Sequence, residues 1–387
     1  MKIGLIDSDL LDNGSRHPNL ALMKISGYMK EKDHEIELLL NYDNIDKYEK
    51  IYISKVFEFT NIPIDVTDKN KYPNIEYGGT GFFNDKAPDL PHDIEHHMPD
   101  YHLYDAYVGN EIARGIKPLR FKDYMDYSIG FATRGCFRKC SFCVNKKYDH
   151  VFKHSPIKEF FDKNRKAIYL WDDNFLGFPE WETVLDELEA TNRAFQFRQG
   201  LDMRLMTDKI AKRLSKVKYH GDYIFAFDHL KDRKTIEDGL KLWRKYTTKT
   251  TKLYVLCAFE SQDENDIKSI FQRIRIIMRY KCLPYIMRYD SYKNSECEGM
   301  YINLARWCNQ PSFYKKKSFR EFCIANQKTT SLKKCATLRY MNEFEEKHPE
   351  IANEFFDMKF EHESLYIENI EVAADKLCVK ENSIMQY

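Results

Sequence analysis

The stretch Phe131–Asn145 reads FATRGCFRKCSFCVN and holds three of the chain's ten cysteines. Three residues separate Cys136 from Cys140, and two separate Cys140 from Cys143. Because each thiolate needs only a short tether, three sulfurs on one loop can surround a single metal centre. Iron–sulfur clusters are held by cysteine thiolates, and a cubane cluster normally uses four. Three protein ligands would therefore leave one iron open to a small molecule.

A structural zinc site is the competing interpretation of the same three thiols. Zinc in such sites takes four ligands, usually from paired cysteines two to four residues apart, and the sequence has no second close pair. We expect the other cysteines to be reduced thiols, mostly buried, although an auxiliary cluster in the later part of the chain stays open. These other cysteines are Cys257, Cys282, Cys297, Cys308, Cys323, Cys335 and Cys378.

Length and composition predict a multidomain globular protein. The chain has 387 residues, enough for two or three domains, and its 61 basic and 60 acidic residues nearly cancel. The overall charge therefore gives no reason to expect nucleic acid or a membrane surface as partner. The start lacks the long apolar segment of a signal peptide, and nowhere do about 18 apolar residues run uninterrupted. We expect a cytoplasmic protein without a membrane span.

The first part of the chain alternates strands and a helix. Short apolar runs predict strands at 2–7, 35–40, 50–56 and 74–77, and the helical spacing of apolar residues predicts a helix at 20–32. This order indicates an open α/β domain with a parallel sheet over residues 1–115. The glycine-rich segment Gly78–Gly81 could cradle a phosphate, but a tight turn is favoured because the segment matches neither phosphate-binding fingerprint.

Residues 84–124 show little periodicity and are expected to connect two domains. The segment contains His92, His96 and His97, which could bind a metal, with His92 and His96 on one helical face. Because no Glu or Cys follows at a matching spacing, a connecting role is favoured.

Six further strands are predicted in residues 116–300. They lie at 127–131, 167–171, 194–197, 223–227, 253–259 and 282–289, with helices expected near 156–164, 181–191 and 208–217. Polar residues follow several of these strands, where barrel enzymes keep their chemistry. From Tyr301 to the end, residues 301–387, the pattern is helical.

The cysteine motif resembles the signature of the radical S-adenosylmethionine (radical SAM) enzymes. The resemblance covers Cys136, Cys140 and Cys143, their position directly after a strand, and the aromatic Phe142 before the last cysteine. It implies an open six-stranded (β/α)6 partial barrel that carries a 4Fe–4S cluster, with S-adenosylmethionine on the open iron. The implied activity is reductive cleavage to a 5'-deoxyadenosyl radical, which abstracts hydrogen from an unknown substrate. A low-potential electron donor such as flavodoxin or ferredoxin is the implied partner.

The same resemblance implies contacts to S-adenosylmethionine from the ends of the early strands. Asp172 and Asp173 stand where the family contacts the amino group. Arg204 could pair with the methionyl carboxylate, and Gln199 and Asp202 could face cofactor or substrate. An internal Asp202–Arg204 pair is an equally good interpretation.

Later strand ends provide three more candidates. Asp228, after the fourth predicted strand, could contact the ribose or the substrate, or cap a helix. Ala258 matches a small residue that packs against adenine in the family, although the glycine often found there is missing. Glu260 ends the fifth strand and is the third candidate.

The first domain resembles the Rossmann-like cobalamin-binding domain that precedes the radical SAM core in one subgroup. Such domains use an Asp-x-His-x-x-Gly loop, and here the loop reads DNGSRHPN over Asp12–Asn19. His17 lacks both the aspartate and the glycine, which argues against cobalamin. Cobalamin-dependent methylation is the alternative enzyme, and a non-catalytic iron–sulfur scaffold is the alternative of another class.

A basic run near the C-terminal end could contact nucleic acid. Lys315–Arg320, with Lys333 and Lys334 further on, is interleaved with Phe313, Tyr314 and Phe319. The acidic run Glu343–Glu346 and the neutral total charge favour an ordinary solvated face.

Overall fold

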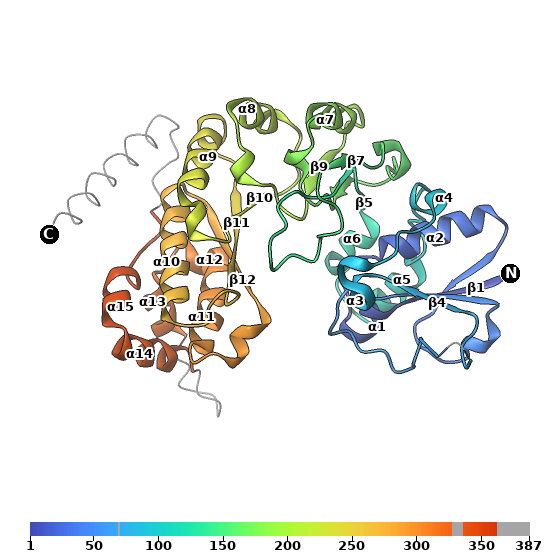
Figure 1. Ribbon diagram of the computed structural model, residues 1–387, viewed down its shortest axis with the longest axis horizontal. Coiled ribbons are helices and arrows are strands. Elements are labelled where there is room, and N and C mark those ends of the chain that lie inside the picture. The colour runs from blue at the N-terminus through green and yellow to red at the C-terminus, as the bar shows by residue number, and fades with distance from the viewer. Residues whose placement is uncertain (69, 327–335, 362–387) are drawn as a thin grey trace. The chain divides into compact units, whose positions relative to one another are not determined.

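The computed structural model describes residues 1–68, 70–326 and 336–361. It divides the chain into two compact units, Met1–Gln199 and Gly200–Tyr387. Figure 1 shows the elements of both units, which are considered one at a time.

A four-stranded parallel sheet forms the start of the first unit. Its strands are β1 (Lys2–Asp7), β2 (Glu35–Leu38), β3 (Lys50–Ser54) and β4 (Ile75–Gly78), in the order β2-β1-β3-β4. The open α/β sheet predicted from the sequence is confirmed. Connections leave β1 in one direction and β3 in the other, so the carboxyl ends of these two strands form a topological switch point. Ligands of open α/β sheets bind at such points.

Both faces of this sheet are covered. Ile3 and Leu5 face helix α2 (Leu20–Glu31), while Ile6, Ile51 and Ile53 pack in a second cluster on the other face. Strands buried on both faces are expected in a parallel sheet. The N-cap of α2 is Asn19, whose side chain accepts from the Leu22 N–H and donates to the Ser54 hydroxyl at 2.8 Å. This bond joins the start of α2 to the end of β3.

The connector contains more helix than its weak periodicity predicts. Its helices are short, and they are α4 (His92–Glu95), α5 (Asp105–Ala113) and α6 (Lys122–Met125). Two further short helices lie outside the connector: α3 (Thr80–Phe83) directly precedes it, and α1 (Ser8–Asn13) follows β1. A helix of one or two turns gives few apolar repeats, which is why the pattern is hard to see. Tyr104 and Val108 pack these helices into the core beside α2.

A second parallel sheet in this unit contains β5 (Tyr127–Gly130), β8 (Ala167–Leu170) and β9 (Ala194–Phe197), with α7 (Trp181–Ala190) between β8 and β9. A short antiparallel pair, β6 (Thr133–Arg134) and β7 (Phe152–Lys153), follows β5. Every residue of β5 and β8 is buried, as expected for strands that read as continuous apolar runs.

The helix predicted at 156–164 is wrong. Only a 3-10 turn forms there, at Ile157–Glu159. The Tyr101 hydroxyl donates to the Phe160 carbonyl at 2.6 Å, and the Ser128 hydroxyl accepts from the Asp162 N–H at 3.0 Å. Backbone groups that a helix would pair are thus satisfied by side chains distant in sequence.

The second unit holds a three-stranded parallel sheet of β10 (Tyr223–Ala226), β11 (Thr251–Cys257) and β12 (Leu283–Arg288). Helices α8 (Asp208–Lys216), α9 (Arg233–Tyr246) and α10 (Glu264–Arg279) alternate with these strands. The predicted helical region is confirmed in its described part, and the prediction for 327–335 and 362–387 lies outside the described residues. Its helices are α11 (Glu298–Cys308), α12 (Pro311–Tyr314), α13 (Phe319–Ala325), α14 (Thr337–Lys347) and α15 (Pro349–Phe355).

The α/β class with parallel sheets is therefore confirmed. All six strands predicted between residues 116 and 300 are present within a few residues of the expected positions. In the described residues they form two three-stranded sheets, so the six-stranded partial barrel stays a prediction.

Candidate functional site

The three cysteines lie on an irregular loop that is closed at its base. Thr133 pairs with Lys153 and Arg134 with Phe152, so β6 and β7 hold the two ends of the segment between them together. Cys136, Cys140 and Cys143 are free thiols, each partly exposed. A hairpin base thus presents all three sulfurs on one loop, as the sequence predicted.

Glycine is required where this loop begins. Gly135 has φ +91°, a left-handed conformation that L side chains rarely adopt. A methyl group at this position would lie 2.1 Å from the His150 carbonyl oxygen. The strand can therefore turn into the loop beside His150 only because residue 135 lacks a side chain.

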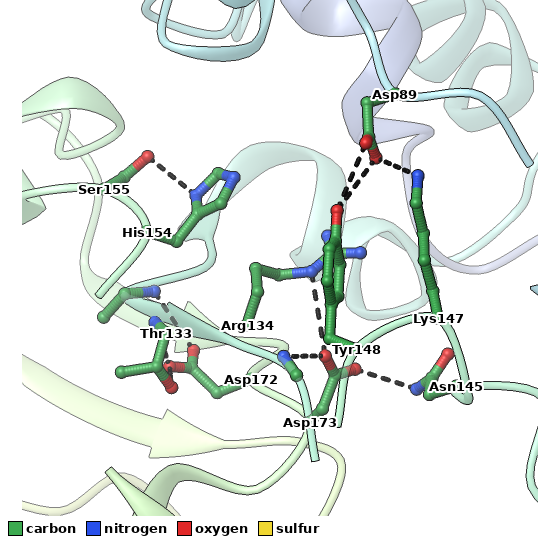
Figure 2. A network of polar contacts seen from close by, with 12 residues as sticks. Asp89, Thr133, Arg134, Asn145, Lys147, Tyr148, His154, Ser155, Asp172 and Asp173 are labelled. Carbon is green, nitrogen blue, oxygen red and sulfur yellow. Dashed lines mark hydrogen bonds and ion pairs between the residues drawn. The ribbon is translucent and has the colours of Figure 1, made fainter. Parts of the chain in front are cut away.

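One carboxylate holds the loop on both sides of the cysteines. Asp173 accepts a hydrogen bond from the Gly135 N–H at 2.8 Å and another from the Asn145 side-chain amide at 2.8 Å. Figure 2 shows Asp173 between these two partners. Gly135 directly precedes Cys136, and Asn145 lies two residues after Cys143, so Asp173 fixes the ends of the cysteine segment.

Asp172 stabilises the strand that leads into the loop. It accepts from the Ala132 N–H at 3.2 Å and from the N–H and hydroxyl of Thr133, both at 2.6 Å. Burial raises the pKa of Asp172 to about 6, although the Thr133 hydrogen bonds oppose that rise. The structure therefore gives Asp172 and Asp173 positions beside the cysteine loop and several bonds to it.

The sulfurs receive the hydrogen bonds that suit thiolates. Arg138 N–H and the Asn174 side-chain amide each lie 3.4 Å from Cys136 Sγ, and Asn145 N–H lies 3.4 Å from Cys143 Sγ. Burial raises the pKa of the Cys143 thiol, and the nearby Cys140 and Cys136 sulfurs raise it further. The three thiols are thus close enough to influence one another electrostatically.

The donor set fits an iron–sulfur cluster in its chemistry and in its place on one loop. Asn174, beside Cys136, has a buried Oδ1 atom without a hydrogen-bond partner in the described residues. Asn174 stands at the N-cap of the 3-10 turn Phe175–Gly177, and its side chain makes no capping hydrogen bond there. In the same described ranges, no group of three or more His, Cys, Asp or Glu side chains converges closely enough to hold a metal ion. The sulfurs would have to move together to bind a cluster.

A cavity of about 690 Å³ adjoins the loop within the first unit. It begins at the carboxyl ends of β3 and β4, at Ser54 and Gly78, and it reaches the cysteine loop. The residues of the loop and its support that line it are Arg134, Gly135, Asn145 and Asp173. It thus lies beside the switch point between β1 and β3, at the edge where open α/β sheets bind ligands.

A chain of polar contacts centred on buried Lys24 and half-buried Glu95 forms one wall of this cavity. Lys24 Nζ lies 2.8 Å from Glu95 Oε1, which lies 3.3 Å from His154 Nε2. Burial alone would raise the pKa of Glu95, but His154 and Lys24 outweigh it and bring that pKa to about 2. The sequence predicted no role for these residues. The one signal in the sequence was that Lys24 stands on the apolar face of a predicted helix, where lysine is uncommon.

The connector histidines do not come together as one group. His92 and His96 have ring centroids 4.4 Å apart, and His96 stacks on His154 at 5.1 Å. His97 instead contacts Glu31, at 2.5 Å. His17 contacts the Asp123 carboxylate and is not among the residues that line the cavity.

Five predicted cofactor residues belong to the second unit, and Gln199 is the exposed last residue of the first. Arg204 Nε lies 2.7 Å from Asp202 Oδ1, so the internal pair considered for these two residues is present. Asp228 accepts from the Leu256 N–H at 3.2 Å and, with Glu260, lines a small cavity of about 200 Å³. Ala258 is buried with φ +59°.

The structure also locates the other predicted features. Tyr314 and Phe319 are fully buried, so these rings are not available to stack on bases. Lys333 and Lys334 lie outside the described residues. Cys257, Cys282, Cys297, Cys308 and Cys323 are buried free thiols, as expected, and Cys335 and Cys378 lie outside the described part. None of the helices in the described ranges combines the length and apolar character needed to span a bilayer.

Comparison with known proteins adds little. No protein-family model and no curated protein matches the chain. Among solved structures, the crystal structure of Streptococcus suis SuiB is similar with a TM-score of 0.32 and 11% sequence identity. That alignment covers 73% of this chain and 67% of the SuiB chain. At this TM-score the likeness supports no conclusion about fold or function.

Proposed function

We propose that the protein is a radical SAM enzyme that acts on a substrate still to be identified. The observation that carries the proposal is one loop with three thiols at Cys-x3-Cys-x2-Cys spacing, both of whose ends are held by Asp173. A bound 4Fe–4S cluster with S-adenosylmethionine would supply reductive cleavage to a hydrogen-abstracting 5'-deoxyadenosyl radical. As the finer architecture we propose the open partial barrel that the sequence predicts, with flavodoxin or ferredoxin as electron donor.

The chain's own residues would bind and orient. Cys136, Cys140 and Cys143 would hold the cluster, and Asp173 would keep their loop in place. Asp172 has its oxygens occupied by strand and hydroxyl donors, so it positions the loop. Asn174 Oδ1, buried and without a partner in the described residues, is the acceptor beside Cys136 that an amino group of the cofactor could use.

Anaerobic reconstitution of the full-length protein with iron and sulfide tests this proposal. We expect about four iron atoms per chain and formation of 5'-deoxyadenosine when dithionite and S-adenosylmethionine are added. Cys140→Ser should lose both, whereas Cys297→Ser, which changes a buried thiol in the second unit, should retain both.

Of three other outcomes, the first two would overturn the proposal, and the third would change the reaction within the radical SAM class. Zinc, or no metal, in anaerobically prepared protein would remove the cluster. Bound iron without any 5'-deoxyadenosine would favour the non-catalytic scaffold. A tightly retained corrinoid with its visible spectrum would favour the cobalamin-dependent methyltransferase.

A further inference from the structure

Arg134 lines the cavity with an unsatisfied Nε–H group. Its Nε atom is buried and has no hydrogen-bond partner within the described residues. The contact with Asp173 Oδ2 is 3.7 Å long, beyond hydrogen-bond range. A guanidinium has five N–H donors, and buried polar groups are nearly always paired. Arg134 therefore has a charged neighbour in Asp173, but its buried Nε–H has no hydrogen-bond acceptor.

Three carboxylates that line the cavity already have other partners. Asp173 accepts from Gly135 and Asn145. Asp89 binds Lys147 at 2.6 Å and the hydroxyl of Tyr148 at 3.2 Å, as Figure 2 shows. Glu95 is shared by Lys24 and His154.

Lys24 is a second cation in the lining of this cavity, which also contains the carboxylates of Glu76, Asp85, Asp89, Glu95 and Asp173. Burial lowers the pKa of Lys24, the bond to Glu95 opposes that change, and the charge of Arg134 lowers the pKa further. Two cations that repel each other across a cavity are both stabilised when an anion enters.

Arg134 is also held in a fixed orientation. Its guanidinium carbon lies 4.1 Å from the centroid of the Phe131 ring, within cation–π range. A guanidinium presents its N–H edge in one plane, and that fork matches the two oxygens of a carboxylate.

The remaining walls offer room and apolar surface. Tyr52, Ile94 and Phe152 line the cavity. Gly78 lines it too, and a methyl group there would meet no described atom within 4 Å, while its φ does not require glycine. The space in front of Gly78 is thus available to a ligand.

We propose that this cavity is a binding site for a small carboxylate with an apolar body, and that Arg134 anchors the carboxylate. In the proposed radical SAM enzyme this ligand is the substrate, which would place its body between the N-terminal sheet and the cysteine loop. The role of this ligand as substrate rests on the proposed function, whereas carboxylate binding at Arg134 does not.

The test uses full-length protein as purified and matched pairs of small probes. Phenylacetate is compared with phenylacetamide, and 3-phenylpropanoate with its amide, by saturation-transfer NMR titration. We expect each carboxylate to bind about tenfold or more tightly than its amide, the effect of a charge-assisted pair. Iron content is measured on the same samples, so a missing cluster and missing carboxylate binding are separate results.

Three variants assign the preference to the site. Arg134→Gln should abolish the difference between carboxylate and amide. Arg138→Gln removes an arginine that lies over the Phe137 ring in the same loop but does not line the cavity, and it should keep the difference. Gly78→Leu, at the end of β4 in the lining of the cavity, should weaken both members of each pair and does not depend on how well Arg134→Gln folds.

Several results would overturn the inference. They are equal binding of carboxylate and amide to the wild-type protein, an unchanged preference in Arg134→Gln, and tighter binding of phenyl phosphate than of either carboxylate. Displacement of the probes by S-adenosylmethionine would assign the cavity to the cofactor and would overturn it as well.

Discussion

Replacement of Asp173 by alanine is expected to open the cysteine loop. The Gly135 N–H is buried and bonded to Asp173 at 2.8 Å, so losing the acceptor costs about 1–3 kcal/mol. Asn145 is exposed, and water can replace its acceptor, so that loss is about 0.5–1.5 kcal/mol. The sum of about 1.5–4.5 kcal/mol corresponds to a change of roughly tenfold to thousandfold in the ratio of closed to open loop.

Hydrogen exchange followed by mass spectrometry measures this change directly. Protection of the peptide that contains the Gly135 amide should fall by the same factor in Asp173→Ala. Asp173→Asn keeps one acceptor oxygen, so its protection should lie between that of Asp173→Ala and that of the wild type. Asp149→Ala is the control, because Asp149 lies in the same loop with an exposed side chain, and protection should not change. Unaltered exchange at Gly135 in Asp173→Ala would refute the idea that this carboxylate holds the loop.

Three further substitutions test other parts of the first unit by urea unfolding. Glu95→Gln leaves buried Lys24 without a charged partner and should lower the free energy of unfolding by about 3–5 kcal/mol. Gly135→Ala places a methyl group 2.1 Å from a backbone oxygen. Gly115 has a similar φ of +94° with open space around it, so Gly115→Ala should lower the free energy of unfolding by only about 1–2 kcal/mol. The loss in Gly135→Ala should be larger. Burial raises the pKa of Asp7 to about 6 from an unfolded value of 3.8. The folded protein therefore binds a proton at a higher pH than the unfolded chain does, and its free energy of unfolding rises as the pH falls from about 6 to 4. Asp7→Asn should remove that part of the gain, about 2–3 kcal/mol.

Each of these expectations has a result that contradicts it. Glu76→Gln breaks an exposed pair with Lys50 and should cost no more than about 1 kcal/mol, so an equal loss in Glu95→Gln would show that burial of Lys24 does not matter. Equal costs for the two glycine variants would mean that the loop relieves the clash. An unchanged slope of stability against pH in Asp7→Asn would show that this carboxyl does not titrate as described.

Local patterns in the sequence were sufficient for most elements of the fold. Apolar runs predicted β1 and β3 because a parallel strand buried on both faces reads as a continuous apolar segment. The helical period at 20–32 predicted α2, whose apolar side packs on the sheet. These signals are local, since burial repeats every two or 3.6 residues along one element.

Sequence patterns were insufficient wherever a side chain distant in the sequence forms a hydrogen bond with a backbone group. The segment 156–164 looks helical, yet Tyr101 and Ser128 satisfy backbone groups there and only a 3-10 turn forms. In the connector, α5 was missed because two turns give too few repeats to stand out.

For the candidate site, the sequence by itself determined the three thiols and their spacing on one loop. It also placed Asp172 and Asp173 at a strand end, but it could not tell which N–H and O–H groups donate hydrogen bonds to them. Only the tertiary structure decided that Asp173 holds Gly135 and Asn145, and that Arg134 lines a cavity with a buried Nε–H that has no hydrogen-bond partner in the described residues. The physical reason is that such partners are tens of residues apart in the chain, and a periodicity records which face of an element is buried but not what that face meets.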